Sequence, residues 1–365
     1  MGRNFAATIV FHALKGWFQT RRTRPLSVCS DSCQAGYQKI KRDGEKFCCF
    51  DCVPCPEGMV SNQKDADDCF HCPEDQYPSK NKDQCIPKVI TFLSYQEPLG
   101  ITLASTAASF SLITILVLGI FIKHNDTPII KANNREFSYI LLISLLLGFL
   151  LSFLYLGQPT RMACYLQQNA VGMILTLAIS CVLAKTLTVL VAFMATKPGS
   201  SMKKCLGKRL TTSVVLSSCL IRAVMSVVWL GIYPPFPYLD MQSMTGEIVA
   251  KCNKGPIVVL CFHLSHMGFL FIITCTVAFL ARNLPDAFTE SRFINLSLCM
   301  LFSVWLWFVP TLMSTQWKFV VVVENLFILA SSAALLGCIF SPKCYIIVLR
   351  PKLNSRDQLR RRKKE

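Results

Sequence analysis

The stretch Leu99–Ile122, LGITLASTAASFSLITILVLGIFI, decides the fold of this chain. It has no charged residue and can cross a bilayer, because a transmembrane helix needs about 20 mainly apolar residues. Six further runs of similar length follow it, at Phe137–Gly157, Asn169–Phe193, Thr211–Ile232, Pro256–Leu280, Phe293–Met313 and Phe319–Phe340. The sequence therefore predicts an all-α bundle of seven transmembrane helices.

The overall composition agrees with a membrane protein. Hydrophobic residues make up 52% of the chain and charged residues only 16%, whereas soluble domains carry about 25% charged residues. The net charge of +17 could indicate a nucleic-acid partner. The basic run Arg360–Lys364 lies in the tail that follows the last apolar run, however, where it is better suited to anionic lipid or a cytosolic protein. We expect no nucleic-acid partner.

The positive charges also set the orientation. The connections 123–136, 194–210 and 281–292, together with the tail after Phe340, hold 19 Lys and Arg residues, and the alternate connections hold four. Lys and Arg are enriched in cytoplasmic loops, so the first set is predicted to be cytoplasmic. Seven spans then place the segment before the first helix outside the cell, in a multi-pass protein of the plasma membrane.

A cysteine-rich segment precedes the helices. Nine of the 19 cysteines lie between Cys29 and Cys85, in a stretch too polar to build a sufficient core without cross-links. Two CxxC pairs in this stretch would suit zinc in a cytosolic protein, but an extracellular location favours disulfides. The predicted organisation is an irregular leader (1–28), which fits a signal-peptide pattern poorly, an extracellular β/loop domain (29–87), the helical domain (97–345) and a basic tail (346–365).

Two further cysteines are predicted to lie on the outer side. Cys164 is near the start of the third helix, and Cys252 is in the loop before the fifth. A bridge between them would tie that loop to the bundle, and two unrelated thiols are the alternative.

Ionisable residues inside the spans are candidates for function, because charges in the membrane are costly. Lys185 in the third helix and Glu290 before the sixth both lie near the cytoplasmic face, where they could form an ion pair, or Lys185 could extend to the headgroups. Glu324, Arg222 and His263, with Asn325 and His266, could line a ligand cavity or a transport path. The alternative is that they are bundle-facing groups satisfied by their neighbours.

The sequence shows none of the catalytic motifs for which it was searched. It contains no phosphate-binding glycine loop, HExxH or GxSxG motif. Trp305 and Trp307 precede Pro310 in the sixth helix, where they suit packing or a helix that swings about a kink. We expect neither catalysis nor a cofactor nor a metal.

Several motifs together resemble the class C G-protein-coupled receptors, over about 28–354. They are Cys48-Cys-Phe-Asp-Cys-Val-Pro-Cys55, Asn125-Asp-Thr-Pro-Ile-Ile-Lys131, Asn134-Arg-Glu-Phe-Ser-Tyr139, Arg282-Asn-Leu-Pro-Asp-Ala-Phe-Thr-Glu-Ser-Arg292, Trp305-Leu-Trp-Phe-Val-Pro310 and Pro342-Lys-Cys-Tyr-Ile-Ile-Val-Leu-Arg-Pro351. The motif Leu-Pro-Asp-Ala-Phe and the run Ala330–Phe340 look most similar to the corresponding segments of vomeronasal type 2 receptors. This resemblance implies a pheromone or other chemosensory role.

The resemblance implies specific roles for individual residues. It implies the bridges Cys29–Cys49, Cys33–Cys52, Cys55–Cys69, Cys72–Cys85 and Cys164–Cys252, with Cys48 unpaired in the module. It favours a latch between Lys185 and Glu290. From their places in the spans, Trp305 and Glu324 remain the candidates for activation or a ligand pocket. The implied partners are a heterotrimeric G protein, membrane lipids and a second class C receptor in a homodimer or heterodimer. The candidate G-protein contacts are Lys203, Lys204, Lys208, Arg282 and Phe288.

The sequence also departs from the family pattern. Thr289 and Ser291 flank the latch Glu290 where the family has Asn and Ala. The bilobed domain that binds agonist in the family has no counterpart in this sequence, so we expect weak constitutive signalling or no ligand-driven signalling. Two rival hypotheses are a non-signalling truncated isoform or gene fragment, and a transporter or channel with a cysteine-rich cap. The latter would need broken helices or internal repeats.

Overall fold

The computed structural model describes residues 29–46, 48–127, 129–130, 134–194, 204–281, 289–314 and 317–350. For 192–194, 204–207, 289–291, 313 and 317–318 it describes only the backbone. The chain divides into two compact units, Met1–Lys88 and Val89–Glu365. Each unit is described by itself.

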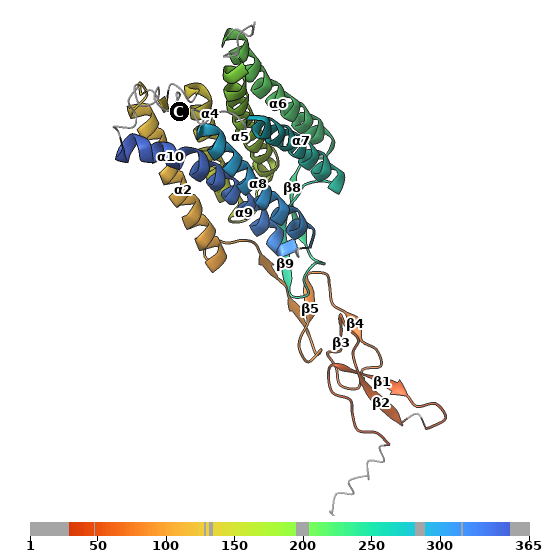
Figure 1. The fold of residues 1–365 in the computed structure, drawn as a ribbon. Helices are drawn as coiled ribbons and strands as arrows, with labels where there is room; N and C mark the ends of the chain where they lie inside the picture. The colour runs from red at the N-terminus through yellow and green to blue at the C-terminus, as the bar shows by residue number, and fades with distance from the viewer. Residues whose placement is uncertain are drawn as a thin grey trace, which may run out of the picture. The chain divides into compact units, whose positions relative to one another are not determined.

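The first unit is a stack of short antiparallel hairpins (Figure 1). β1 (Tyr37–Lys41) pairs with β2 (Phe50–Pro54), β3 (Met59–Val60) with β4 (Phe70–His71), and β5 (Gln76–Pro78) with β6 (Cys85–Pro87). Strands this short cannot bury much apolar surface. Among the described residues of this unit, the buried apolar core consists of Val60 and three half-cystines, Cys33, Cys49 and Cys55.

Disulfides therefore stabilise this unit. The bridges formed are Cys29–Cys49, Cys33–Cys52, Cys55–Cys69 and Cys72–Cys85, which are the pairs that the resemblance implies. They close loops of 13 to 20 residues, and a loop of this length contributes about 3 kcal/mol in the chain-entropy account. Cys48 is a free thiol.

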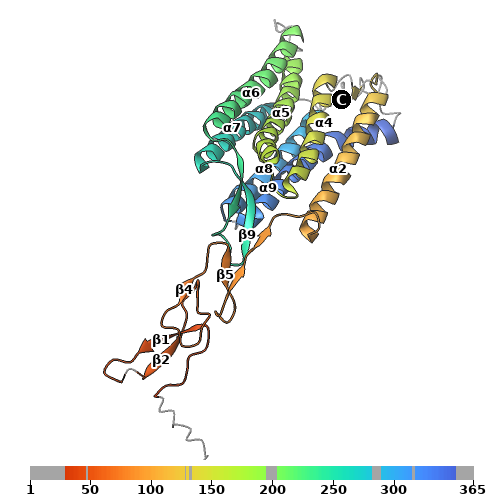
Figure 2. The ribbon, with the colours of Figure 1, turned by 180° about the vertical axis from the view of Figure 1, so that it is seen from behind.

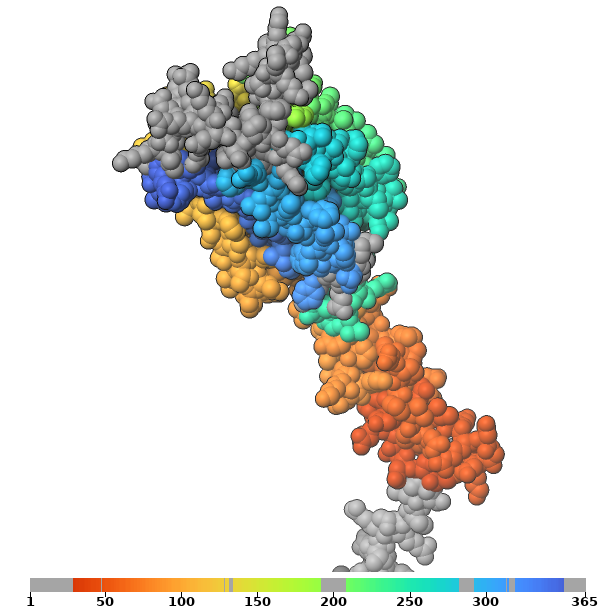
Figure 3. Space-filling model, in the orientation of Figure 1, coloured from red at the N-terminus to blue at the C-terminus, as the bar shows by residue number. Residues whose placement is uncertain are grey.

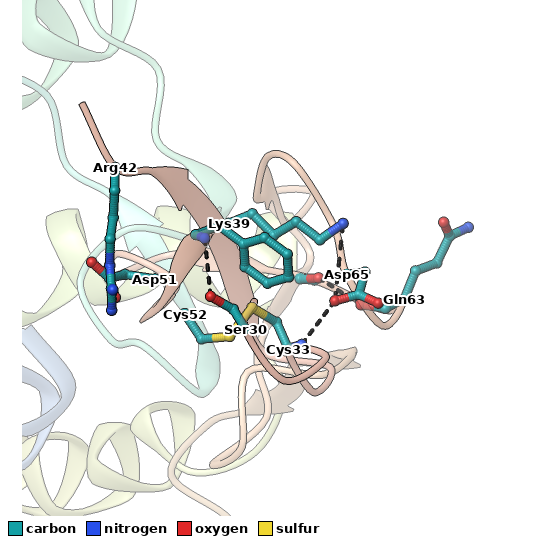
Figure 4. Close-up of a disulfide and its surroundings, with 10 residues drawn as sticks. Ser30, Cys33, Lys39, Arg42, Asp51, Cys52, Gln63 and Asp65 are labelled. Atoms are coloured by element: carbon teal, nitrogen blue, oxygen red, sulfur yellow. Dashed lines mark hydrogen bonds and ion pairs between the residues drawn. A yellow bond between two sulfur atoms is a disulfide. The ribbon is translucent and has the colours of Figure 1, made fainter. Parts of the chain in front are cut away.

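Polar contacts organise the tip of the unit around the second bridge (Figure 4). The backbone N–H of Cys33 donates to Asp65 Oδ1 at 2.8 Å, and Lys39 Nζ lies 3.9 Å from the same oxygen. Across the β1–β2 hairpin, Arg42 Nη2 donates to Asp51 Oδ1 at 2.6 Å. This hydrogen bond lowers the pKa of the Asp51 carboxyl and raises that of Arg42.

The second unit contains the seven predicted transmembrane helices, which confirms the predicted fold class. They are α2 (Pro98–Lys123), α4 (Arg135–Leu151), α5 (Arg161–Met194), α6 (Lys204–Ile232), α7 (Ile257–Ala281), α8 (Thr289–Ser314) and α9 (Trp317–Leu335). Short 3₁₀, π and α segments extend α4 and α9: η1 (Ser152–Tyr155), η3 (Leu336–Phe340), α10 (Ser341–Cys344) and η4 (Tyr345–Leu349).

Helix α5 is the centre of the bundle, lying among α4, α6, α7 and α8 in both ribbon views (Figure 2). In its most apolar window 67% of the residues are buried, against 22% in α2 and α6. The apolar faces of α2 and α6 that remain exposed are therefore available to lipid. On another face the side chains of α7 and α8 adjoin (Figure 3).

The main apolar core joins α2, α4 and the end of the last span. Phe121 packs edge-on against Phe340, with ring centroids 5.5 Å apart, and both rings are buried. Helices α4 and α9 approach closely where Gly148 faces Ser332, since a Cβ at Gly148 would lie 3.0 Å from Ser332 Oγ. Small residues at helix contacts commonly allow such packing in membranes.

A three-stranded sheet lies at the outer end of this unit. β7 (Val89–Thr91) pairs in parallel with β9 (Glu247–Asn253), which pairs antiparallel with β8 (Phe236–Asp240). Asp240 closes the hairpin by accepting from Lys251 Nζ at 2.5 Å and from the backbone N–H groups of Gln242 and Ser243. Burial alone would raise the pKa of Asp240, but these hydrogen bonds, with one from the Ser243 hydroxyl, hold it well below its ordinary value.

Three helix ends differ from the prediction by seven residues or more. α5 begins at Arg161 rather than Asn169, α6 begins at Lys204 rather than Thr211, and the last span extends to Leu349 rather than Phe340. Hydropathy finds only the part of a helix inside the hydrocarbon, whereas backbone hydrogen bonding continues the helix through polar residues at the interface.

Candidate functional site

The outer end of the bundle is organised by one disulfide. Cys252 in β9 is bridged to Cys164, which is fully buried near the start of α5, with their Cα atoms 5.4 Å apart. The bridge fixes the strand against the central helix. It therefore also fixes Lys254, which follows β9 directly in the loop before α7.

Lys254 forms an ion pair with Glu324 of α9. The Lys254 side chain is 33% exposed and that of Glu324 is 15% exposed. The ammonium also lies 5.8 Å from the centroid of the buried Tyr155 ring, and the Lys254 carbonyl accepts from Gln168 Nε2 at 3.3 Å. We call Lys254, Glu324 and Tyr155 the outer lock. It joins the loop after β9 to α9 and to the end of α4.

An aromatic cluster lies next to the outer lock along α9. Phe327, one helical turn after Glu324, stacks on Phe308 with ring centroids 4.1 Å apart and meets the edge of Trp305 at 5.6 Å. Trp305 and Phe308 both belong to α8. The two sequence candidates Trp305 and Glu324 are therefore in one neighbourhood, linked through Phe327, so that a shift of α8 against α9 would reach the outer lock.

The cytoplasmic half of α5 is tied to α4 by polar side chains. Lys185 is buried and donates to Ser138 Oγ at 2.8 Å, and Asn134 Nδ2 donates to Thr188 Oγ1 at 2.6 Å. Burial argues against the alternative in which Lys185 extends to the headgroups. The side chain of Glu290 lies outside the described residues, so the latch between Lys185 and Glu290 stays a prediction.

Most of the predicted G-protein contacts also lie outside the described part of the chain. This applies to Lys203, Arg282 and Phe288, and of Lys204 only the backbone is described. Lys208 is described, and its ammonium lies 2.8 Å from Glu136 Oε1 at the cytoplasmic end of α4. Their side chains are 67% and 63% exposed, so this pair contributes at most about 1 kcal/mol and leaves both groups accessible to a partner.

Lys254 and Tyr155 were missed by sequence reasoning. The one available signal for Lys254 was its position beside Cys252 in a loop with few basic residues. Tyr155 carried no signal, because a tyrosine at the end of an apolar run is ordinary in membrane helices.

Comparisons with known proteins match both units. A family model described as "7 transmembrane sweet-taste receptor of 3 GCPR" matches residues 93–343, and one described as "Nine Cysteines Domain of family 3 GPCR" matches residues 24–78. The chain is 48% identical to vomeronasal type-2 receptor 26 of Mus musculus and 41% identical to the extracellular calcium-sensing receptor of Homo sapiens. Each alignment covers 94% of this chain, but only 40% and 32% of those two relatives.

Proposed function

This chain belongs to the family 3, or class C, G-protein-coupled receptors, and we propose that it transmits a chemosensory signal across the plasma membrane to a heterotrimeric G protein. The observation that carries the proposal is the similarity to vomeronasal type-2 receptors along 94% of the chain. The predicted absence of enzyme chemistry agrees with membership in a receptor family.

The outer sheet supports a route by which a signal would enter the bundle. β7 follows the cysteine-rich unit directly in the chain and is hydrogen-bonded to β9. β9 is covalently tied to α5 through the Cys164–Cys252 bridge, and the next residues lead to the outer lock on α9. A displacement of β7 would therefore act on the central helix and on the last span together.

The proposed exit is at the cytoplasmic ends of α4, α5, α6 and α8. These ends would adopt two arrangements, one of which binds a G protein more tightly. A ligand shifts the equilibrium between two states only if its affinity for them differs. In this account the Lys185–Glu290 latch favours the resting arrangement. Dimerisation with another class C receptor extends the proposal and rests on family membership alone.

The test is guanine-nucleotide exchange on purified heterotrimeric G proteins, with the full chain in lipid nanodiscs. We expect the wild type to raise exchange slightly above the receptor-free rate for at least one Gα class. We expect Lys185→Met, which removes the latch charge, to raise it further. Lys80→Ala is the matched control, because Lys80 is an exposed lysine in the cysteine-rich unit.

Exchange at the receptor-free rate for every Gα class, with both the wild type and Lys185→Met, would contradict the proposal. Ion flux through the same protein in vesicles, without nucleotide exchange, would instead favour the channel hypothesis.

A further inference from the structure

A buried arginine lies within α6, on the side facing α5 and α7. Arg222 is only 2% exposed. Along the helix axis, Arg222 lies about 15 Å before the end of α6 at Ile232, because each residue adds about 1.5 Å. A charge at this depth is costly unless a partner or a bound ion compensates it.

Within the described part of the chain, no carboxylate pairs with the guanidinium of Arg222. Its Nε and Nη1 atoms are buried and have no hydrogen-bond partner among the described residues. Its Nη2 atom lies 3.4 Å from His263 Nδ1, which belongs to an imidazole rather than an acid. The sequences of α5, α6 and α7 contain no Asp or Glu. The three helices that surround the guanidinium therefore supply no carboxylate to neutralise it.

The neighbouring polar groups on α7 are also unsatisfied. His263 Nε2 and His266 Nδ1 are buried, and no residue that the structure describes forms a hydrogen bond with them. Residues three apart lie on the same side of a helix, so both imidazoles belong to the face of α7 nearest Arg222. An imidazole N–H can donate to an anion, and a guanidinium is a fixed donor array that keeps its charge.

The packing makes specific room for the guanidinium. A Cβ added to Gly172 of α5 would lie 1.6 Å from Arg222 Nη2 and 2.4 Å from Cζ. The guanidinium thus lies directly against the backbone of α5, where only glycine leaves enough space. A side chain other than glycine at this position would displace the charged group.

We propose that Arg222, His263 and His266 bind a small inorganic anion of halide size between α5, α6 and α7. The anion supplies the missing negative charge and accepts from the unpaired nitrogens. Lipid phosphate is a poor candidate, because the 2% exposure of Arg222 keeps it from the headgroups. His263 follows the outer end of α7 at Ile257 by about 9 Å, so the site is nearest to the extracellular side.

The test uses chloride as the probe, on the purified full chain in phosphatidylcholine nanodiscs. The ionic strength is held constant by replacing chloride with gluconate, an organic anion much larger than a halide. We expect saturable binding of radiolabelled chloride at one site per chain. We also expect the unfolding temperature to rise by about 5 °C when chloride reaches roughly 100 times its Kd.

Three variants separate the site from a general salt effect. Arg222→Gln should abolish chloride binding and the temperature shift. Gly172→Ala, which keeps every charge but displaces the guanidinium, should weaken binding at least ten-fold. Gly268→Ala is the control. Gly268 lies on α7, the same helix as the two histidines, and a Cβ added there meets no atom within 4 Å. If Arg222→Gln fails to fold, Gly172→Ala decides the question.

Absence of saturable chloride binding in the wild type would overturn the proposal. Binding in Gly172→Ala as tight as in Gly268→Ala would also overturn it, since the guanidinium would then play no part.

Discussion

The outer lock can be dissected by a double-mutant cycle. The variants are Lys254→Met, Glu324→Gln and the double substitution. Pairs on the surface contribute at most about 1 kcal/mol, whereas breaking a fully buried pair costs about 3–5 kcal/mol. With side chains 33% and 15% exposed, the lock lies between these limits, so we expect a coupling energy of about 2 kcal/mol.

The two single substitutions should differ in cost. After Glu324→Gln, the Lys254 ammonium keeps its contact with the Tyr155 ring. It is also more exposed to solvent than Glu324 is. After Lys254→Met, the less exposed Glu324 carboxylate loses its cation and stays poorly solvated. We therefore expect Lys254→Met to destabilise the chain more than Glu324→Gln does.

The assay is thermal unfolding of the purified chain in one detergent at one salt concentration. A coupling of about 2 kcal/mol corresponds to roughly 4 °C for a unit of this size. The double variant should unfold about 4 °C above the temperature that adding the two single effects would give. Strict additivity of the two effects, or a larger cost for Glu324→Gln, would contradict an ion pair in which Glu324 is the less exposed partner.

Three further predictions concern stability. Phe327→Ala removes the ring that stacks on Phe308 and should destabilise the bundle by about 3–5 kcal/mol, seen as a lower unfolding temperature; an unchanged temperature would mean that the aromatic cluster is not packed as described. Cys252→Ser should cost about 2–4 kcal/mol, whereas Cys261→Ser, at a free and exposed cysteine of α7, should be neutral, and equal effects would argue against the bridge. Because hydrogen bonds lower the pKa of Asp240 in the folded chain, its stabilisation is present above the unfolded value of about 3.9 and is lost as pH falls toward the folded value. The gap in unfolding temperature between wild type and Asp240→Asn should thus be constant from pH 7 to about 5 and shrink below about 4, and a gap that shrinks near neutral pH would count against this assignment.

The helical architecture was predictable because each span is a long run with few charges between polar connections. Leu99–Ile122 has no charged residue at all, and the connections carry a strong asymmetry of Lys and Arg. These features depend only on the local exclusion of water by lipid. The ends of α5 and of the last span were less predictable, because helix continues beyond the hydrocarbon through hydrogen bonds that hydropathy does not register.

The connectivity of the disulfides could not be predicted from the spacing of the cysteines. The cysteine content predicts disulfides in the first unit but not their connectivity, since nine cysteines with one left unpaired allow roughly 900 arrangements, about a hundred for each choice of the unpaired residue. Resemblance to a family was needed to choose one, and the structure forms the same pairs.

A residue of the outer site could be predicted only where it was unusual by itself in the sequence. Glu324 is an unusual charge within a span and could be found by itself. Its partner Lys254 is far away in the chain and reaches it through a tertiary path that includes the Cys164–Cys252 bridge. Arg222 was likewise conspicuous in the sequence, but only the three-dimensional packing shows that none of the described acidic residues pairs with it.

The proposed signalling requires that the outer and cytoplasmic ends of the bundle are coupled. Its most direct test is the equilibrium affinity of the nanodisc-embedded chain for nucleotide-free G protein, measured with the outer lock intact and in Lys254→Met. Coupling between distant sites is typically about 1–3 kcal/mol, so the account predicts that the two affinities differ by at least about five-fold. Affinities that agree within about two-fold, with both proteins folded, would contradict it.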